Sequence, residues 1–128
     1  MPAQWKELTR IANSLPPGAI YGIGLEPFTG YVINLNACTN AHLDPTDAED
    51  FCVLLMSSEC AGGELVIYEL GLVLQLEGGD VVAFRSKTLT HFNLHYQGRR
   101  VSVVLHTDQA NAHWEAHYEQ YVELGLVQ

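Results

Sequence analysis

Short apolar runs separated by glycine-containing turns occupy most of this chain, and they constrain its fold more than any other feature. Each run is too short for a typical helix, and runs joined by tight turns pair as antiparallel strands. The sequence therefore predicts a mainly β fold, a sandwich or barrel of antiparallel strands rather than a parallel α/β sheet. The runs lie at 19–23, 31–35, 51–56, 64–68, 72–76, 81–84, 91–96 and 101–106, and the breaks include 61–63, 69–71, 77–80 and 97–98.

Two segments near the ends of the chain have helical spacing instead. Segment 3–14 places Trp5 and Leu8 on one face, and the Pro-Pro-Gly sequence at 16–18 ends it. Segment 110–122 gathers aromatic and histidine side chains on one side, so we expect a closing helix that packs outside the sheets. With 128 residues, 48% of them hydrophobic, the chain is long enough for one domain spanning 1–128.

The charge balance limits the partners that this surface can bind. Fifteen acidic and six basic residues give a formal net charge of −9, which disfavours a nucleic-acid partner. Four of the six basic residues form two clusters, Arg85 with Lys87 and Arg99 with Arg100. A local positive pocket for a small anion is still compatible with this acidic exterior.

The cysteines and the absence of long apolar runs predict that the protein is intracellular. No run approaches the length of a signal peptide or a membrane span, so we expect an intracellular protein without a membrane partner. Cys38, Cys52 and Cys60 are odd in number and lack C-x-x-C spacing, which favours reduced thiols over disulfides or a structural zinc site. We expect all three to be small core residues.

His42 and Asp44 are the first candidate metal ligands. They are two residues apart, so in an extended segment both side chains project to the same side and can reach one metal ion. Imidazole and carboxylate suit Fe(II), Mn(II), Ni(II) or Zn(II). A polar loop ahead of Pro45 explains the same two residues equally well, so the pair needs support from elsewhere in the chain.

That support comes from His91, Arg100 and Ser102. We expect His91 to begin a strand and the turn at 97–98 to reverse the chain, so that Arg100 returns beside the metal site on the neighbouring strand. A guanidinium there can hold a carboxylate through two hydrogen bonds. Ser102, two residues further on, projects to the same side and can bind the same oxygens.

In this order, H-x-D, a distal histidine and R-x-S, the chain resembles the Fe(II)/2-oxoglutarate-dependent dioxygenases. The resemblance runs from about Tyr31 to Asp108, and the segments 62–65, 78–84 and 98–102 are similar to strands of the TET/JBP-like and prolyl-hydroxylase-like branches. It implies a double-stranded β-helix (jelly-roll) core with flanking N- and C-terminal helices. It also implies an enzyme that oxidises a substrate with release of succinate and CO₂.

The resemblance assigns a role to each candidate. It implies that His42, Asp44 and His91 bind Fe(II), and that Arg100 and Ser102 bind the distal carboxylate of the co-substrate 2-oxoglutarate. Relatives also place polar contacts to the co-substrate on the strand before H-x-D, where this chain has Tyr31, Asn34, Asn36 and Thr39.

Two neighbouring residues compete for these roles. Arg99 could replace Arg100 as the anchor, but adjacent residues of a strand face opposite ways and only Arg100 begins R-x-S. His95 could replace His91, or it could line the pocket from the same strand face. His113 and His117 lack the H-E-x-x-H order, so we interpret them as part of an ordinary helix face.

Alternative functions remain open at this point. A jelly roll with a metal-compatible pocket could be a non-catalytic module that binds a small ligand or a metal. A TET/JBP-like nucleobase oxygenase is a further alternative, although the net charge of −9 disfavours it. The chain has little beyond the core motif, which indicates either a small-molecule or exposed-residue substrate, or a site completed by a partner or second subunit. The sequence does not predict the oligomeric state.

Overall fold

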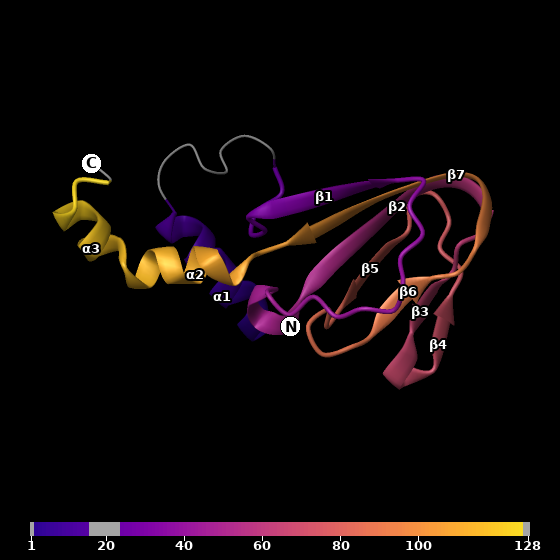
Figure 1. Ribbon diagram of the computed structural model, residues 1–128, viewed down its shortest axis with the longest axis horizontal. Helices are drawn as coiled ribbons and strands as arrows, with labels where there is room; N and C mark the ends of the chain where they lie inside the picture. Colours follow the sequence, from indigo (N-terminus) through magenta and orange to yellow (C-terminus); the bar gives the residue numbers. More distant parts are fainter. Residues whose placement is uncertain (1, 16–23, 127–128) are drawn as a thin grey trace.

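Two antiparallel β-sheets lie one above the other at one end of the molecule, and the helices lie at the opposite end (Figure 1). The computed structural model describes residues 2–15 and 24–126. Its helices are α1 (Pro2–Ser14), α2 (Gln109–Ala116) and α3 (Tyr118–Glu123), with short 3₁₀ turns η1 (Ala48–Asp50) and η2 (Tyr68–Leu70). Its strands are β1 (Gly30–Leu35), β2 (Cys52–Gly62), β3 (Leu65–Ile67), β4 (Leu72–Leu74), β5 (Val81–Phe84), β6 (His91–Asn93) and β7 (Tyr96–His106).

The long strands β2 and β7 connect the two sheets. One sheet has the order β1-β7-β2-β5 and the other β4-β3-β6. Strands β2 and β7 pair from Val53 and Leu105 at one end to Gly62 and Tyr96 at the other. Beyond that end β2 continues into β3, and β6 leads into β7. The sheets are therefore joined at one end, and their inner faces enclose a shared interior.

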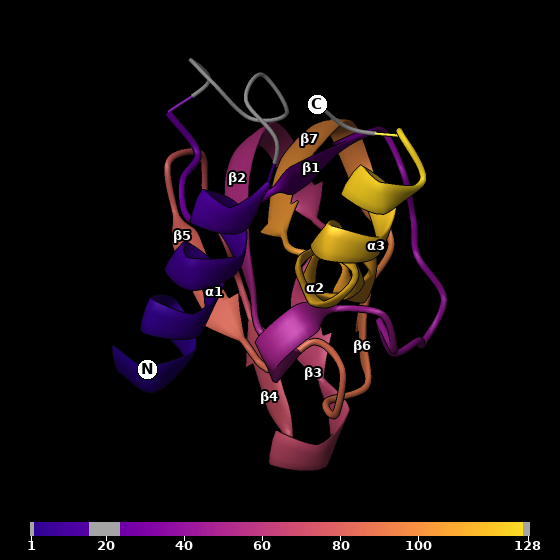
Figure 2. The same cartoon turned by 90° about the vertical axis from the view of Figure 1, so that its left-hand side faces the viewer.

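Alternation along the strands separates the two faces of the four-stranded sheet. One hydrophobic cluster fills the interior between the sheets, with Cys52, Leu54 and Met56 from β2 against Leu65 and Ile67 from β3. A second cluster lies where α1 covers one end of the outer face, and it contains Leu8, Ile11, Phe28, Ala48, Phe51 and Leu105. Figure 2 shows α1 and α2 side by side at this end of the sheets.

The mainly β prediction is confirmed, and so is the helix over 3–14, which the structure extends by one residue to Pro2–Ser14. The prediction of a single closing helix over 110–122 is wrong. The segment divides at His117, whose φ of −115° and ψ of 12° are not helical, into α2 and α3. The predicted strand at 19–23 lies outside the described residues.

The predicted turn at 97–98 is also wrong. Gly98 lies within β7, opposite Cys60 of β2. Its φ is +101°, and a Cβ there would be 2.8 Å from the Glu59 carbonyl oxygen. The glycine therefore permits two long strands to approach closely rather than reversing the chain. Residues 94–95, between β6 and β7, instead carry the chain from the three-stranded sheet to the four-stranded sheet.

The three cysteines differ in burial, which corrects the expectation that all belong to the core. Cys52 is buried, and this burial raises the pKa of its thiol to about 12. Cys38 is exposed and Cys60 is only partly buried. None of the helices formed by residues 2–15 and 24–126 is long and apolar enough to cross a membrane.

Candidate metal centre

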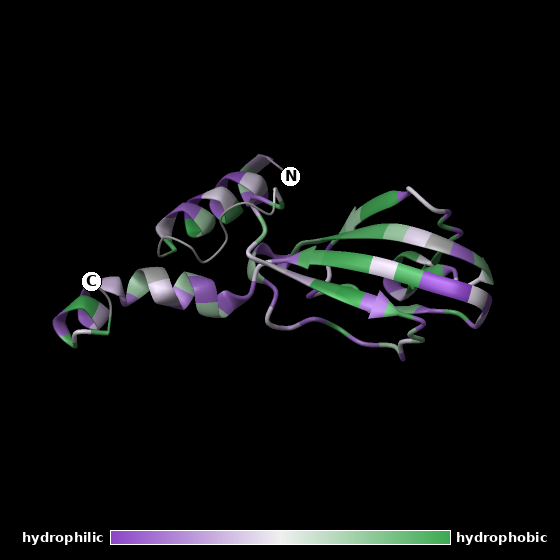
Figure 3. Cartoon of the chain, turned by 90° about the horizontal axis from the view of Figure 1, so that it is seen from above, coloured by the Kyte–Doolittle hydropathy of each residue, from purple (hydrophilic) through white to green (hydrophobic). Residues whose placement is uncertain are grey.

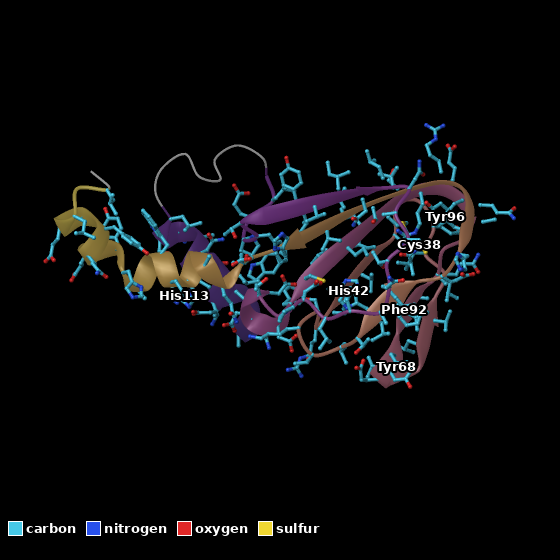
Figure 4. The ribbon with its side chains drawn as sticks, in the orientation of Figure 1. Cys38, His42, Tyr68, Phe92, Tyr96 and His113 are labelled. Atoms are coloured by element: carbon cyan, nitrogen blue, oxygen red, sulfur yellow. The ribbon has the colours of Figure 1, made fainter. Side chains whose placement is uncertain are left out.

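Three predicted ligands converge between the two sheets. The donor atoms of His42, Asp44 and His91 all lie within 4.8 Å of one another. The Asp44 carboxylate stands between the imidazoles, with Oδ2 3.2 Å from Nε2 of His91 and Oδ1 3.7 Å from Nε2 of His42. Figure 4 shows His42 at the sheets, whereas His113 lies on α2, away from this group.

Backbone pairing brings the segment 42–44 onto the end of β6. His42 and His91 form an isolated antiparallel bridge, in which each backbone N–H donates to the other carbonyl at 3.1 and 3.0 Å. The Asp44 backbone N–H donates to the Ser86 carbonyl at 3.0 Å. Main-chain hydrogen bonds therefore hold ligands that are far apart in the sequence beside one another.

Each histidine ring is oriented by a carbonyl two residues before it. Nδ1 of His42 lies 2.7 Å from the Asn40 carbonyl oxygen, and Nδ1 of His91 lies 2.9 Å from the Leu89 carbonyl oxygen. A carbonyl only accepts, so both Nδ1 atoms carry a proton. In the neutral rings the Nε2 lone pairs are then free to bind a metal, which is the usual orientation of ligating histidines.

The charges of the group depend on one another. The hydrogen bond from His91 lowers the pKa of Asp44, with burial opposing the shift. Burial alone would lower the pKa of His91, but the Asp44 carboxylate raises it above its ordinary value of 6.5. The His91 side chain is 9% exposed, while those of His42 and Asp44 are 38% and 35% exposed. The group thus has a deep ligand and two ligands nearer the solvent.

A cavity of about 300 Å³ opens beside these ligands, between the inner faces of the sheets. Arg100, Ser102, Val104 and His106 line it as alternate residues of β7, so they form a row along the strand. The volume is at the small end of the roughly 300–1,000 Å³ typical of ligand pockets. The cavity can therefore hold a small molecule that reaches from the three ligands to Arg100.

Arg100 is a buried cation, and no carboxylate of the described residues pairs with it. It is 4% exposed, and among residues 2–15 and 24–126 its Nε has no hydrogen-bond partner and its guanidinium forms no ion pair. Gly63 makes room for this side chain, since a Cβ at that position would lie 3.1 Å from Nε and 3.2 Å from Cδ of Arg100. A buried charge of this kind is stable only with a partner, and an anionic ligand in the cavity would supply one.

The other predicted co-substrate residues lie in three different places. Ser102 is 1% exposed and lines the cavity, where the Asn34 amide lies 3.5 Å from its hydroxyl. Asn36 is exposed outside the cavity; its amide oxygen accepts a 2.9 Å hydrogen bond from the Arg100 backbone N–H. It therefore holds the main chain of Arg100. Tyr31 is 49% exposed and does not line the cavity.

The structure separates the competing residues clearly. Arg99 is exposed and points to the opposite face of the sheet, where it lines a surface depression with Glu59. His95 is exposed in the connection between β6 and β7, outside the cavity lining. His117 directs Nδ1 to the carbonyl oxygen of His113 at 2.9 Å, so these two rings do not converge through that atom.

Two residues of the cavity wall were not predicted from the sequence. Asn93 is buried, and its amide oxygen accepts hydrogen bonds from both the backbone N–H and the hydroxyl of Thr39 at 2.8 Å, which fixes the segment that precedes His42. Asp47 is buried and accepts a hydrogen bond from the Ser86 hydroxyl. Burial raises the pKa of Asp47. In the sequence, only the position of Asp47 three residues after Asp44 could have indicated that it lies near the ligands.

Comparisons with known proteins give a structural relative. No protein-family model matches the chain, and no curated protein matches it in sequence. The solved structure of NgTET1 in complex with 5mC DNA has a TM-score of 0.68 and 17% sequence identity, covering 80% of this chain and 42% of the NgTET1 chain. This chain therefore spans less than half the length of that protein, and at this identity the similarity shows that the two share a fold.

Proposed function

We propose that this protein is an Fe(II)- and 2-oxoglutarate-dependent dioxygenase, and that its two sheets form a double-stranded β-helix in one domain. The observation that carries the proposal is a buried Arg100, whose Nε has no partner among the described residues, in the same cavity as a two-histidine, one-carboxylate group. The motif order in the sequence and the fold similarity to NgTET1 support it independently.

The ligand chemistry fits Fe(II). His42, Asp44 and His91 would bind the metal through two imidazole nitrogens and one carboxylate oxygen, the set used by non-haem Fe(II) oxygenases. No cysteine belongs to the group, which argues against a structural zinc site. The tautomers set by the Asn40 and Leu89 carbonyls present the correct nitrogen atoms.

The other end of the cavity fits the co-substrate. The Arg100 guanidinium would pair with the distal carboxylate of 2-oxoglutarate, and the Ser102 hydroxyl would donate to the same group. Asn34 holds that hydroxyl on the inner face of the sheet. Bound Fe(II) and 2-oxoglutarate would together supply the oxidation of a substrate C–H bond by O₂, with release of succinate and CO₂. The protein orients these groups and keeps water from Arg100.

Anaerobic titration tests the assignment. Adding Fe(II) and 2-oxoglutarate to the protein should produce a metal-to-ligand charge-transfer band, and Asp44→Ala should abolish it. His95→Ala is the matched control, because this histidine is exposed outside the cavity, and the band should persist. A band that is absent from the unmodified protein, or unchanged in Asp44→Ala, would contradict the proposal.

Catalysis is tested separately from binding. Slow succinate formation without added substrate is expected of an oxygenase that uncouples. A protein that shows the charge-transfer band but forms no succinate with any candidate substrate would instead be the non-catalytic binding module. The basic residues of this chain do not favour binding of DNA, the ligand in the NgTET1 structure. Of its few basic residues, Arg85 is paired with Asp50 and Arg100 is buried.

A further inference from the structure

In the part of the chain that the structure describes, strand β1 is an edge of the four-stranded sheet, and it lacks the usual protection of an edge strand. Its sequence contains no charged residue and no proline, and its register with β7 is continuous from Gly30 to Leu35. Tyr31, Ile33 and Leu35 are 49%, 53% and 67% exposed. Natural edges usually carry lysine, proline or a bulge that prevents pairing with another chain. This edge is therefore suited to pairing.

The backbone groups of β1 alternate between its neighbour and the free edge. At the end of the ladder the Asn36 N–H donates to the Arg100 carbonyl at 2.7 Å, so even-numbered residues turn their N–H groups toward β7. Odd-numbered residues then turn their N–H and C=O groups away from β7. Within the part of the chain that the structure describes, no backbone hydrogen bond reaches this outer edge.

The odd-numbered residues also belong to an apolar row on the outer face of the sheet. The registers place Ile33, Val103, Leu55 and Val81 side by side across all four strands. Ile33, Leu55 and Val81 are 53%, 36% and 61% exposed, because α1 covers only the end of the face near Leu105. Figure 3 shows this face uncovered, with hydrophobic residues along its strands and the helices beyond one end.

We propose that a second copy of this chain pairs with β1, antiparallel to it, about a two-fold axis at Ile33. Directly opposite residues in such a pair share a face, so an outward residue must meet an outward residue. Centring on Ile33 satisfies this rule and places Tyr31 opposite the partner's Leu35. The outer apolar row then continues without interruption into the second molecule.

The charge distribution favours association of two copies at the β1 edge rather than through the acidic parts of the surface. Each chain carries a formal charge of −9, so two copies repel one another over most of their surface. No aspartate, glutamate, lysine or arginine occurs between Glu26 and Asp44, the segment that contains β1. An isologous interface brings this neutral segment against itself.

The pairing would also extend the cavity wall. Val32 and Asn34, the even-numbered residues of β1, line the cavity from the inner face of the sheet. About the proposed axis, the partner's Asn34 lies opposite Val32 at the rim of this cavity. Each site would thus be bordered by the other copy. This inference does not depend on the proposed oxygenase activity.

Sedimentation velocity on the full chain tests the proposal. The unmodified protein should be a dimer, and Ile33→Lys should be a monomer because the axis places the two lysines face to face. Ile33→Glu should also be a monomer, and an equimolar mixture of the two variants should recover the dimer. The matched control is Val73→Lys on the edge strand β4; Val73 is 60% exposed, and this variant should remain dimeric.

Each outcome decides the question. A monomeric unmodified protein over a wide concentration range would overturn the proposal, and so would a dimer that persists in Ile33→Lys. Failure of the mixed variants to associate would reject pairing centred on Ile33. If Ile33→Lys loses its β circular dichroism signal, Ile33→Pro replaces it. That change removes an N–H that points away from β7, so the variant should fold and be monomeric.

Discussion

Arg100→Met should have opposite effects on stability and on co-substrate binding. The substitution keeps an unbranched side chain of similar length but removes the charge from the cavity. Arg100 is 4% exposed, and its Nε has no hydrogen-bond partner among the residues that the structure describes. Removing a buried, unsatisfied polar group is worth about 1–3 kcal/mol. We therefore expect the free energy of unfolding of the ligand-free protein to rise by about this amount.

Binding of 2-oxoglutarate should weaken at the same time. Truncating one member of a buried, hydrogen-bonded charge pair costs about 2–5 kcal/mol, which corresponds to a roughly 30-fold to 4,000-fold higher Kd. The backbone of the strand should stay in place, because Asn36 holds the main-chain N–H of residue 100 at 2.9 Å. The loss should therefore reflect the guanidinium itself.

Two measurements and one control distinguish an anchoring role of Arg100 from a purely structural role. Urea unfolding of the ligand-free protein gives the stability change, and the anaerobic charge-transfer titration gives the Kd for 2-oxoglutarate. Arg99→Met is the control, since Arg99 is exposed on the opposite face of the same strand, and it should change neither quantity. An Arg100→Met protein that is less stable and binds 2-oxoglutarate normally would refute the anchor role.

Two further predictions concern the pair of His91 with Asp44 and the glycine beside Arg100. Burial lowers the pKa of His91, but the Asp44 carboxylate raises it further, so the pKa lies above 6.5 in the folded protein. Protonated His91 therefore stabilises the fold below pH 6.5, and this stabilisation is lost as the pH rises through the raised pKa. Urea unfolding as a function of pH should show this loss, and His91→Ala should remove it. Gly63→Ala should weaken 2-oxoglutarate binding, measured by the same titration, because its Cβ would displace the guanidinium. Gly71→Ala, at a similar positive φ with no atom within 4 Å, should cost only about 1–2 kcal/mol of backbone strain and leave binding unchanged.

Strand alternation explains why much of the site could be predicted from sequence. Residues two apart on a strand share a face, which placed Ser102 with Arg100 and assigned Arg99 to the other side; the structure has this arrangement. The same rule brought His42 and Asp44 to one side. Periodicity of two is a local property, so a sequence reports it directly.

Residues whose role depends on pairing between distant segments were harder to predict. Asn36 was expected to contact the co-substrate, but its amide bonds the backbone of residue 100 from a left-handed conformation with φ of 50°. Asn93 and Thr39 hold one another across more than fifty residues of sequence. Neither relation has a periodic signal, because each follows from which strand lies beside which.

Glycine illustrates the same limit most clearly. Gly98 and Gly63 both lie between apolar runs of the sequence, and both indicated a turn. Gly63 does follow the end of β2, yet its lack of a side chain also admits the guanidinium of Arg100. Gly98 lies inside β7 and admits the backbone of β2. A glycine among apolar runs therefore predicts that something approaches closely, and only the pairing of strands determines whether it is a turn, a neighbouring strand or a functional side chain.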